Sequence, residues 1–204
     1  VNAQREVLQD LITHGQYTQF GRKYGFSEIF AIRKFKEAVP IHEYQDLKPY
    51  IDQIMDGEES VLWNTPVEWF AKSSGTTSDK SKFIPITKES IEDNHFQAAK
   101  DVLTIFYHAY PESDLLTGKG IVVGGSHQVH PLKDNIQYGD LSGVLLQNSP
   151  FWSNFIRTPE LAIALMDEWE GKIEALAQST INEPVTSISG VPTWTMVLLK
   201  RILE

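Results

Sequence analysis

Small hydroxyl residues, one glycine and several lysines cluster between two apolar stretches in the first half of the chain. Residues 70–87 read FAKSSGTTSDKSKFIPIT. In such a turn the backbone N–H groups can point inward, hydroxyl groups add further donors, and lysines neutralise phosphate oxygens. This composition predicts a loop that binds an anion, and we interpret the anion as the triphosphate of a nucleotide.

The charge of this loop is opposite to the charge of the whole chain, whose formal net charge is −9. An acidic chain of this kind is a poor non-specific ligand for nucleic acid or for an anionic membrane, because both require dense positive charge. Against that background four lysines gather around the loop, which favours a local anion site. A solvated lysine cluster with no ligand is the alternative. The four are Lys72, Lys80, Lys82 and Lys88.

Bulk composition is that of an ordinary globular protein. The 204 residues are 41% hydrophobic and 22% charged, which is enough to bury a sizeable core. No apolar run approaches the roughly 20 residues that a membrane-spanning helix needs. The sequence contains no cysteine, so disulfides, thiolate nucleophiles and thiolate metal sites are excluded. We expect a cytoplasmic protein without a membrane partner.

The elements on either side of the loop are predicted strands. Residues 67–71 are rich in aromatic and branched side chains, and residues 83–86 read FIPI, in which Pro85 indicates an edge strand. The loop therefore joins strand to strand. A Walker A loop instead requires Gly-Lys-Ser/Thr at the start of a helix, and a dinucleotide loop requires three spaced glycines, so both are excluded.

The rest of the chain predicts an α/β fold with mixed sheets flanked by helices. Residues 1–62 form a mainly helical lead-in, in which Asp46 is a candidate cap for a helix that ends at Gly57. Residues 63–204 form the α/β part with the loop. The further expected elements are a helix over 91–106, strands at 121–123, 144–146 and 185–189, helices after Thr158 that break near Gly171, and a helix after Pro192.

A metal site is not predicted. His127 and His130 are close in sequence, but no nearby carboxylate completes a familiar ligand spacing. We therefore assign no metal ligand in this chain.

The loop and its neighbours carry a family resemblance. Residues Ser73, Ser74, Gly75, Thr76 and Thr77, followed by Lys82, resemble the ATP phosphate loop of the adenylate-forming superfamily. With the sequel FIPIT, the loop is more similar still to that of the auxin-responsive acyl-acid amido synthetases. Two flanking segments also resemble this family, VPIHEYQDLKPYIDQIMDGE upstream of the loop and TSISGVPTW near the end of the chain.

The resemblance implies an enzyme that uses ATP and Mg²⁺. It would activate a small-molecule carboxylic acid as an acyl-adenylate, and an amine, typically an amino acid, would then take the acyl group to form an amide. Ser73, Ser74, Gly75, Thr76 and Thr77 would cradle the β- and γ-phosphates. Lys82 would be the catalytic residue, stabilising charge that grows on the leaving pyrophosphate.

The acid-binding residues are less defined than the loop. Gly190, Val191, Pro192 and Trp194, with the aromatic pair at 151–152, could line an apolar acyl pocket. Core packing explains the same residues equally well. The identity of the acid and of the acceptor stays open.

The resemblance also predicts that parts of the enzyme are missing. The family's adenine, ribose and magnesium motifs and its mobile C-terminal domain would lie beyond residue 204, so we expect the N-terminal portion of a large domain, inactive when isolated. One residue departs from the family pattern, since Asp79 replaces a glycine of the loop. A non-catalytic nucleotide-binding or interaction module with the same fold is therefore one alternative. An acyl-CoA-type thioester synthetase is a second alternative.

Overall fold

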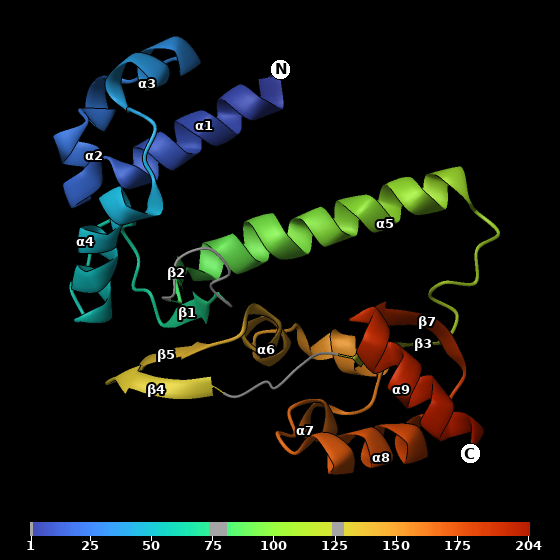
Figure 1. Cartoon of the computed structure of the whole chain (residues 1–204). Coiled ribbons are helices and arrows are strands. Elements are labelled where there is room, and N and C mark those ends of the chain that lie inside the picture. The colour runs from blue at the N-terminus through green and yellow to red at the C-terminus, as the bar shows by residue number, and fades with distance from the viewer. Residues whose placement is uncertain (1, 74–80, 124–128) are drawn as a thin grey trace. The chain divides into compact units, whose positions relative to one another are not determined.

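The computed structural model of the chain describes residues 2–73, 81–123 and 129–204. Helices alternate with two β-sheets in this part of the chain, which confirms the predicted α/β class (Figure 1). The helices longer than one turn are α1 (Asn2–Gly15), α2 (Gln19–Lys23), α3 (Ile32–Ala38), α4 (Tyr44–Met55), α5 (Gln97–Ala109), α6 (Leu141–Gln147), α8 (Trp169–Thr180) and α9 (Pro192–Leu203). The strands are β1 (Trp69–Lys72), β2 (Phe83–Ile86), β3 (Lys119–Val123), β4 (Val129–Lys133), β5 (Ile136–Gly139), β6 (Arg157–Thr158) and β7 (Val185–Gly190).

Short helical turns complete the element order. The 3₁₀ turns are η1 (Phe26–Glu28) and η3 (Phe151–Phe155), a π-helical stretch, η2 (Ser90–Phe96), leads into α5, and α7 (Leu161–Ala164) is a single turn. No helix of the described residues is long and apolar enough to cross a membrane.

The chain folds as two compact units. The first contains residues 1–70, 83–87 and 131–137, and the second contains residues 71–82, 88–130 and 138–204. The predicted division into a helical lead-in over residues 1–62 and an α/β part over residues 63–204 stays a prediction.

In the first unit, a buried threonine fixes the turn from α1 to α2. The Thr18 hydroxyl donates to the carbonyl oxygen of Gly15 over 2.7 Å and accepts from the N–H of Gly21 over 2.9 Å. Threonine is a favoured helix cap because its oxygen satisfies an N–H of the first turn. A Cβ atom at Gly21 would lie 2.0 Å from the Gly15 carbonyl oxygen, so glycine is required where the two segments meet.

Helix α4 begins with a reciprocal cap. The Glu43 side chain accepts from the backbone of Asp46, and the Asp46 carboxylate accepts from the N–H of Glu43 over 2.9 Å. This pair satisfies two N–H groups that a helix start leaves without intrahelical partners. The prediction that Asp46 itself is the cap was wrong by three residues, because Asp46 is the distal member of the pair. Ile51 and Ile54 bury the inner face of the helix.

The two sheets differ in topology. One has four strands in the order β2-β1-β5-β4, with β2 at an edge as Pro85 predicted. The other has three strands in the order β6-β3-β7, and β3 is parallel to both of its neighbours. In the register between β3 and β7, Ile121 lies opposite Ile188 and Val123 lies opposite Gly190.

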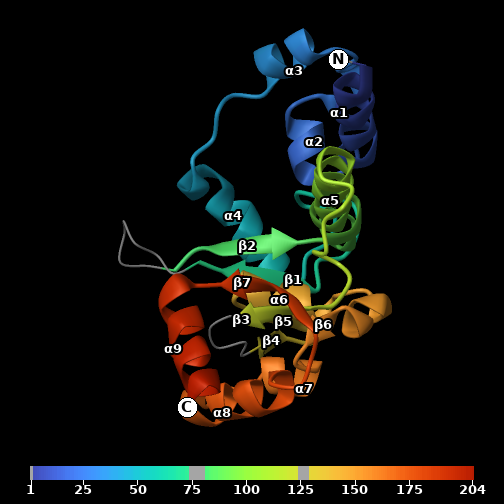
Figure 2. The same ribbon diagram turned by 90° about the vertical axis from the view of Figure 1, so that its right-hand side faces the viewer.

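The main apolar core belongs to the second unit and lies between the three-stranded sheet and two helices. Figure 2 shows α8 and α9 beside the strands of this sheet. Buried side chains of β3, α8 and α9 pack together, and none of them is more than 7% exposed. They are Ile121, Val123, Ile173, Leu176, Ala177 and Leu198.

Two sequence predictions in this unit were wrong. Residues 144–146 belong to helix α6, where Gly143 and Val144 are buried, and they do not form a strand. A short apolar run cannot distinguish a buried strand from a buried helical turn. The helical break near Gly171 is also misplaced, because α8 continues through Gly171 and the interruption lies at residues 165–168.

A lysine is buried at the start of α8, which predicts a pH dependence of folding. Lys172 is 2% exposed, and burial lowers the pKa of its ammonium group, an effect that the charge of Asp167 partly offsets. Between this lowered pKa and the ordinary pKa of lysine, the unfolded chain binds more protons than the folded chain. The free energy of unfolding therefore rises with pH in that interval.

We expect Lys172→Met to reduce the rise of the free energy of unfolding with pH. Urea denaturation at a series of alkaline pH values measures this dependence. Lys200→Met is the matched control, because Lys200 is an exposed lysine of α9. A wild-type slope that persists in Lys172→Met and disappears in Lys200→Met would contradict the assignment.

Candidate functional site

The predicted phosphate loop is closed at its base by the two residues that flank it. The N–H of Ser73 donates to the carbonyl oxygen of Lys82 over 2.8 Å, and the N–H of Lys82 donates to the Ser73 hydroxyl oxygen over 3.2 Å. Both residues are half-buried. The structure thus brings together the first and last of the predicted site residues. Ser74, Gly75, Thr76 and Thr77, together with Asp79 and Lys80, lie outside the described residues.

This closure has a chemical consequence for Ser73. When the hydroxyl oxygen accepts the N–H of Lys82, the O–H group retains its capacity as a donor. A hydroxyl donor and a lysine ammonium at the two ends of a loop suit the oxygens of an anion. The arrangement can hold and neutralise an anion.

A second lysine beside the loop is held by an aromatic ring. The Lys72 ammonium at the end of β1 lies 5.9 Å from the centre of the Tyr138 ring on β5, a neighbouring strand. The His130 ring of β4 lies 5.2 Å from the same Tyr138 ring. A cation is attracted to an aromatic face, so Tyr138 orients positive charge next to Ser73. No local sequence pattern indicates Tyr138, because the pairing of β1 with β5 is long-range.

Lys88 pairs with an acidic side chain of its own helical stretch. It lies 3.9 Å from Glu92 in the helical stretch that follows β2, and its side chain is 80% exposed. We therefore do not count Lys88 among the residues that hold the anion.

The region predicted to contact the acid has a structural role in the second unit. A Cβ atom at Gly190 would lie 2.5 Å from the Val123 carbonyl oxygen, so the close approach of β7 to β3 requires glycine. Trp194 packs against the main core, with its ring 5.4 Å from that of Trp169. Val191 and Pro192 are exposed at the start of α9. A role of these residues in binding the acid stays a prediction.

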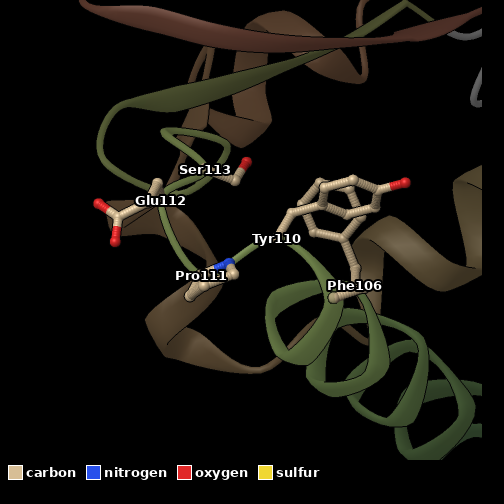
Figure 3. A pocket seen from close by; sticks show the side chains of 6 residues that line it. Phe106, Tyr110, Pro111, Glu112 and Ser113 are labelled. Carbon is tan, nitrogen blue, oxygen red and sulfur yellow. The ribbon is translucent and has the colours of Figure 1, made fainter.

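An open apolar hollow lies at the C-terminal end of α5. Phe106, Tyr110 and Pro111 provide its surface, and Figure 3 shows the carboxylate of Glu112 pointing away from the two aromatic rings. None of the described residues that line this hollow is cationic, so it does not resemble a phosphate site.

The described residues contain no group of three or more His, Asp or Glu side chains that could hold a metal ion. His127 lies outside them, and the His130 ring lies tilted against the Tyr138 ring.

Comparison with known proteins decides the family. The GH3 family N-terminal domain matches residues 1–204, the whole of the chain. The chain belongs to the GH3 family. The resemblance inferred from the loop and its flanking segments is thereby confirmed.

Two plant proteins are among the relatives that the chain matches. This GH3 chain is 31% identical over 150 residues to a jasmonoyl--L-amino acid synthetase, JAR4, of Nicotiana attenuata, a match that covers 72% of the chain and 25% of the relative. It is 33% identical over 102 residues to a probable indole-3-acetic acid-amido synthetase, GH3.13, of Oryza sativa subsp. japonica, covering 46% of the chain and 22% of the relative. The chain thus spans about a quarter of the length of these relatives.

Solved structures show the same fold. A GH3.15 acyl acid amido synthetase superimposes with a TM-score of 0.75 at 19% identity, over 97% of this chain and 35% of that protein. AtGH3.15 in complex with 2,4-DB gives a TM-score of 0.65 at 19% identity, over 87% of this chain and 30% of the other. At this identity the likeness establishes the fold alone.

The close contact at Gly190 predicts the cost of a side chain there. We expect Gly190→Ala to lower the free energy of unfolding by about 1–3 kcal/mol, because a backbone oxygen of a central strand cannot move aside cheaply. Urea denaturation of the chain measures the change. Ser189→Ala is the control, since Ser189 is the exposed neighbour on the same strand. An increase in stability on Gly190→Ala would show that the strands can separate at this point.

Proposed function

We propose that the GH3 protein containing this chain activates a small-molecule carboxylic acid with ATP and transfers the acyl group to an amine to form an amide. The observation that carries the proposal is the family match over residues 1–204, together with relatives named as amido synthetases. Adenylation as the activating step, and an amino acid as the acceptor, are proposals for this protein.

Ser73 and Lys82, which form the base of the predicted phosphate loop, support a role of this loop in binding the triphosphate. Ser73 and Lys82 are held together by two hydrogen bonds, so the loop between them is closed at a defined point. A loop fixed at both ends can hold the β- and γ-phosphates while the carboxylate approaches the α-phosphorus in line. The entropic cost of aligning the reactants is then met on binding.

Lys82 has a role that changes along the reaction. Negative charge increases on the pyrophosphate as its bond to the α-phosphorus breaks, and a fixed ammonium group stabilises that charge more strongly than it stabilises bound ATP. The oxygen of the carboxylate forms the new bond to phosphorus, and pyrophosphate leaves. The amine then attacks the acyl carbon, releasing AMP.

Magnesium, when bound to the triphosphate, would supply further neutralisation of the leaving group. The Lys82 ammonium suits a phosphate oxygen and cannot be a magnesium ligand, and the described residues contain no group of three or more His, Asp or Glu side chains that could hold the ion. Within this part of the chain, we therefore assign neutralisation of the leaving group to lysine side chains.

The absence of cysteine suits the reducing cytoplasm, which is the location that belongs to this proposal. The net charge of −9 favours small-molecule partners over nucleic acid or an anionic membrane surface.

Carboxylate-dependent exchange of labelled pyrophosphate into ATP tests the first half-reaction in the full-length protein. We expect exchange with at least one acid of a panel containing indole-3-acetic acid, jasmonic acid and 2,4-DB, and amide formation when amino acids are added. Conversion of coenzyme A in place of an amino acid would indicate a thioester synthetase. Binding of Mg-ATP without exchange would indicate a non-catalytic nucleotide-binding module.

Lys82→Ala tests the residue assigned to the leaving group. We expect the exchange rate of the full-length protein to fall by the equivalent of about 2–4 kcal/mol of transition-state stabilisation. Lys88→Ala removes another lysine that follows the loop, one that pairs with Glu92, and should leave the rate nearly unchanged. Equal rates for Lys82→Ala and wild type would remove Lys82 from the mechanism.

A further inference from the structure

The residue that follows Lys82 presents its backbone to the open edge of a sheet. Strand β2 is the terminal strand in the order β2-β1-β5-β4, so only one of its sides is paired within that sheet. Along a strand, the N–H and C=O groups of successive residues point to alternate sides. Lys82 directs both groups to Ser73, and Phe83 therefore directs its own groups to the opposite side.

The hydroxyl group of Tyr44 lies on this side of Phe83. The N–H of Phe83 donates to the Tyr44 hydroxyl oxygen over 3.0 Å, and the Tyr44 hydroxyl lies 3.3 Å from the Phe83 carbonyl oxygen, to which it donates. Tyr44 thus makes both of the bonds that a further strand would make to Phe83. Tyr44 is half-buried, and its contact with Phe83 lies within the first unit.

The placement of Tyr44 is itself fixed by the start of α4. Tyr44 is the first residue of the helix, directly after the reciprocal cap formed by Glu43 and Asp46. Ile51 and Ile54, in the following turns of the helix, are buried. The hydroxyl group is therefore carried on a rigid element, which is the condition for positioning another group precisely.

We propose that Tyr44 is a positioning residue for the phosphate loop, which it serves by holding the peptide that follows Lys82. The peptide joining Lys82 to Phe83 is tied at both of its polar groups, because its carbonyl oxygen accepts from the N–H of Ser73 and its N–H donates to the Tyr44 hydroxyl oxygen. Rotation of this peptide would redirect the Lys82 side chain, because the backbone at a residue sets the direction of its Cα–Cβ bond. This inference rests on the proposed function, in which Lys82 meets the triphosphate.

The same contact gives a role to the segment upstream of the loop, residues 39–58. In sequence this segment carries only a resemblance and a predicted helix. In the structure it supplies the hydroxyl group that ends the loop at a defined backbone position.

Tyr44→Phe in the full-length protein tests the inference, because it removes the hydroxyl group and keeps the ring. We expect the KM for Mg-ATP in pyrophosphate exchange to rise about five- to tenfold, the effect of losing roughly one net hydrogen bond, with the KM for the carboxylic acid unchanged. Hydrogen exchange followed by mass spectrometry should show faster exchange in peptides that contain the Lys82 and Phe83 amides.

Tyr50→Phe is the matched control. Tyr50 is another half-buried tyrosine of α4, and its hydroxyl accepts from Lys23 of α2 over 2.9 Å. Its replacement should leave the KM for Mg-ATP and the exchange of the loop-base amides as in wild type.

The outcomes separate this inference from the proposed function. Absence of carboxylate-dependent exchange in the wild-type protein overturns the proposed function, and the positioning role with it. Normal wild-type exchange with an unchanged KM for Mg-ATP in Tyr44→Phe overturns the positioning role alone. Equal rises in the KM values for Mg-ATP and acid, or a lower melting temperature with unchanged kinetics, would assign Tyr44 a purely structural role and also overturn it.

Discussion

The pair of hydrogen bonds between Ser73 and Lys82 is the constraint on which the candidate site depends. A loop rich in Gly, Ser and Thr loses much conformational entropy when it is ordered around an anion, and a closed base reduces the part of that cost paid on binding. The pair also fixes which residues begin and end the loop. Lys72 immediately precedes it, and the Tyr138 ring attracts its ammonium group. Positive charge is thereby held at the base of the loop in a chain of net charge −9.

The parallel sheet of the second unit provides a different kind of constraint. Its strands approach so closely that glycine is required at Gly190, where a Cβ atom would meet the Val123 carbonyl oxygen. Helix α9 begins two residues later, and Leu198 and Trp194 anchor it to the core. Within the GVP segment, which carries part of the family resemblance, Gly190 is thus explained by packing, whereas Val191 and Pro192 are exposed. A role of this segment in binding the acid is a matter for acid-binding measurements. Ser73 and Lys82, in contrast, are not members of the apolar core, so core packing does not explain the hydrogen bonds between them.

Local chemistry was enough to predict many elements from the sequence. Residues 67–71 and 83–86 read as strands around a turn, and Pro85 indicated an edge. Errors arose where neighbouring segments decide the conformation. Residues 144–146 are apolar in either a helix or a strand, and the structure makes them helical. The cap of α4 was misassigned because Glu43 and Asp46 are both acidic, and only geometry shows which carboxylate accepts from which N–H group.

The contact of Tyr44 with Phe83 shows why the candidate site could be predicted only in part. Its two residues are 39 positions apart, and nothing in the helical pattern of α4 distinguishes Tyr44 from Tyr50. The distinction appears only when β2 becomes an edge strand, because an edge leaves backbone donors and acceptors that need partners. Sequence can identify a loop by the groups that would touch an anion. The groups that hold its backbone are defined by sheet topology, since any suitably placed hydroxyl could fill the same role.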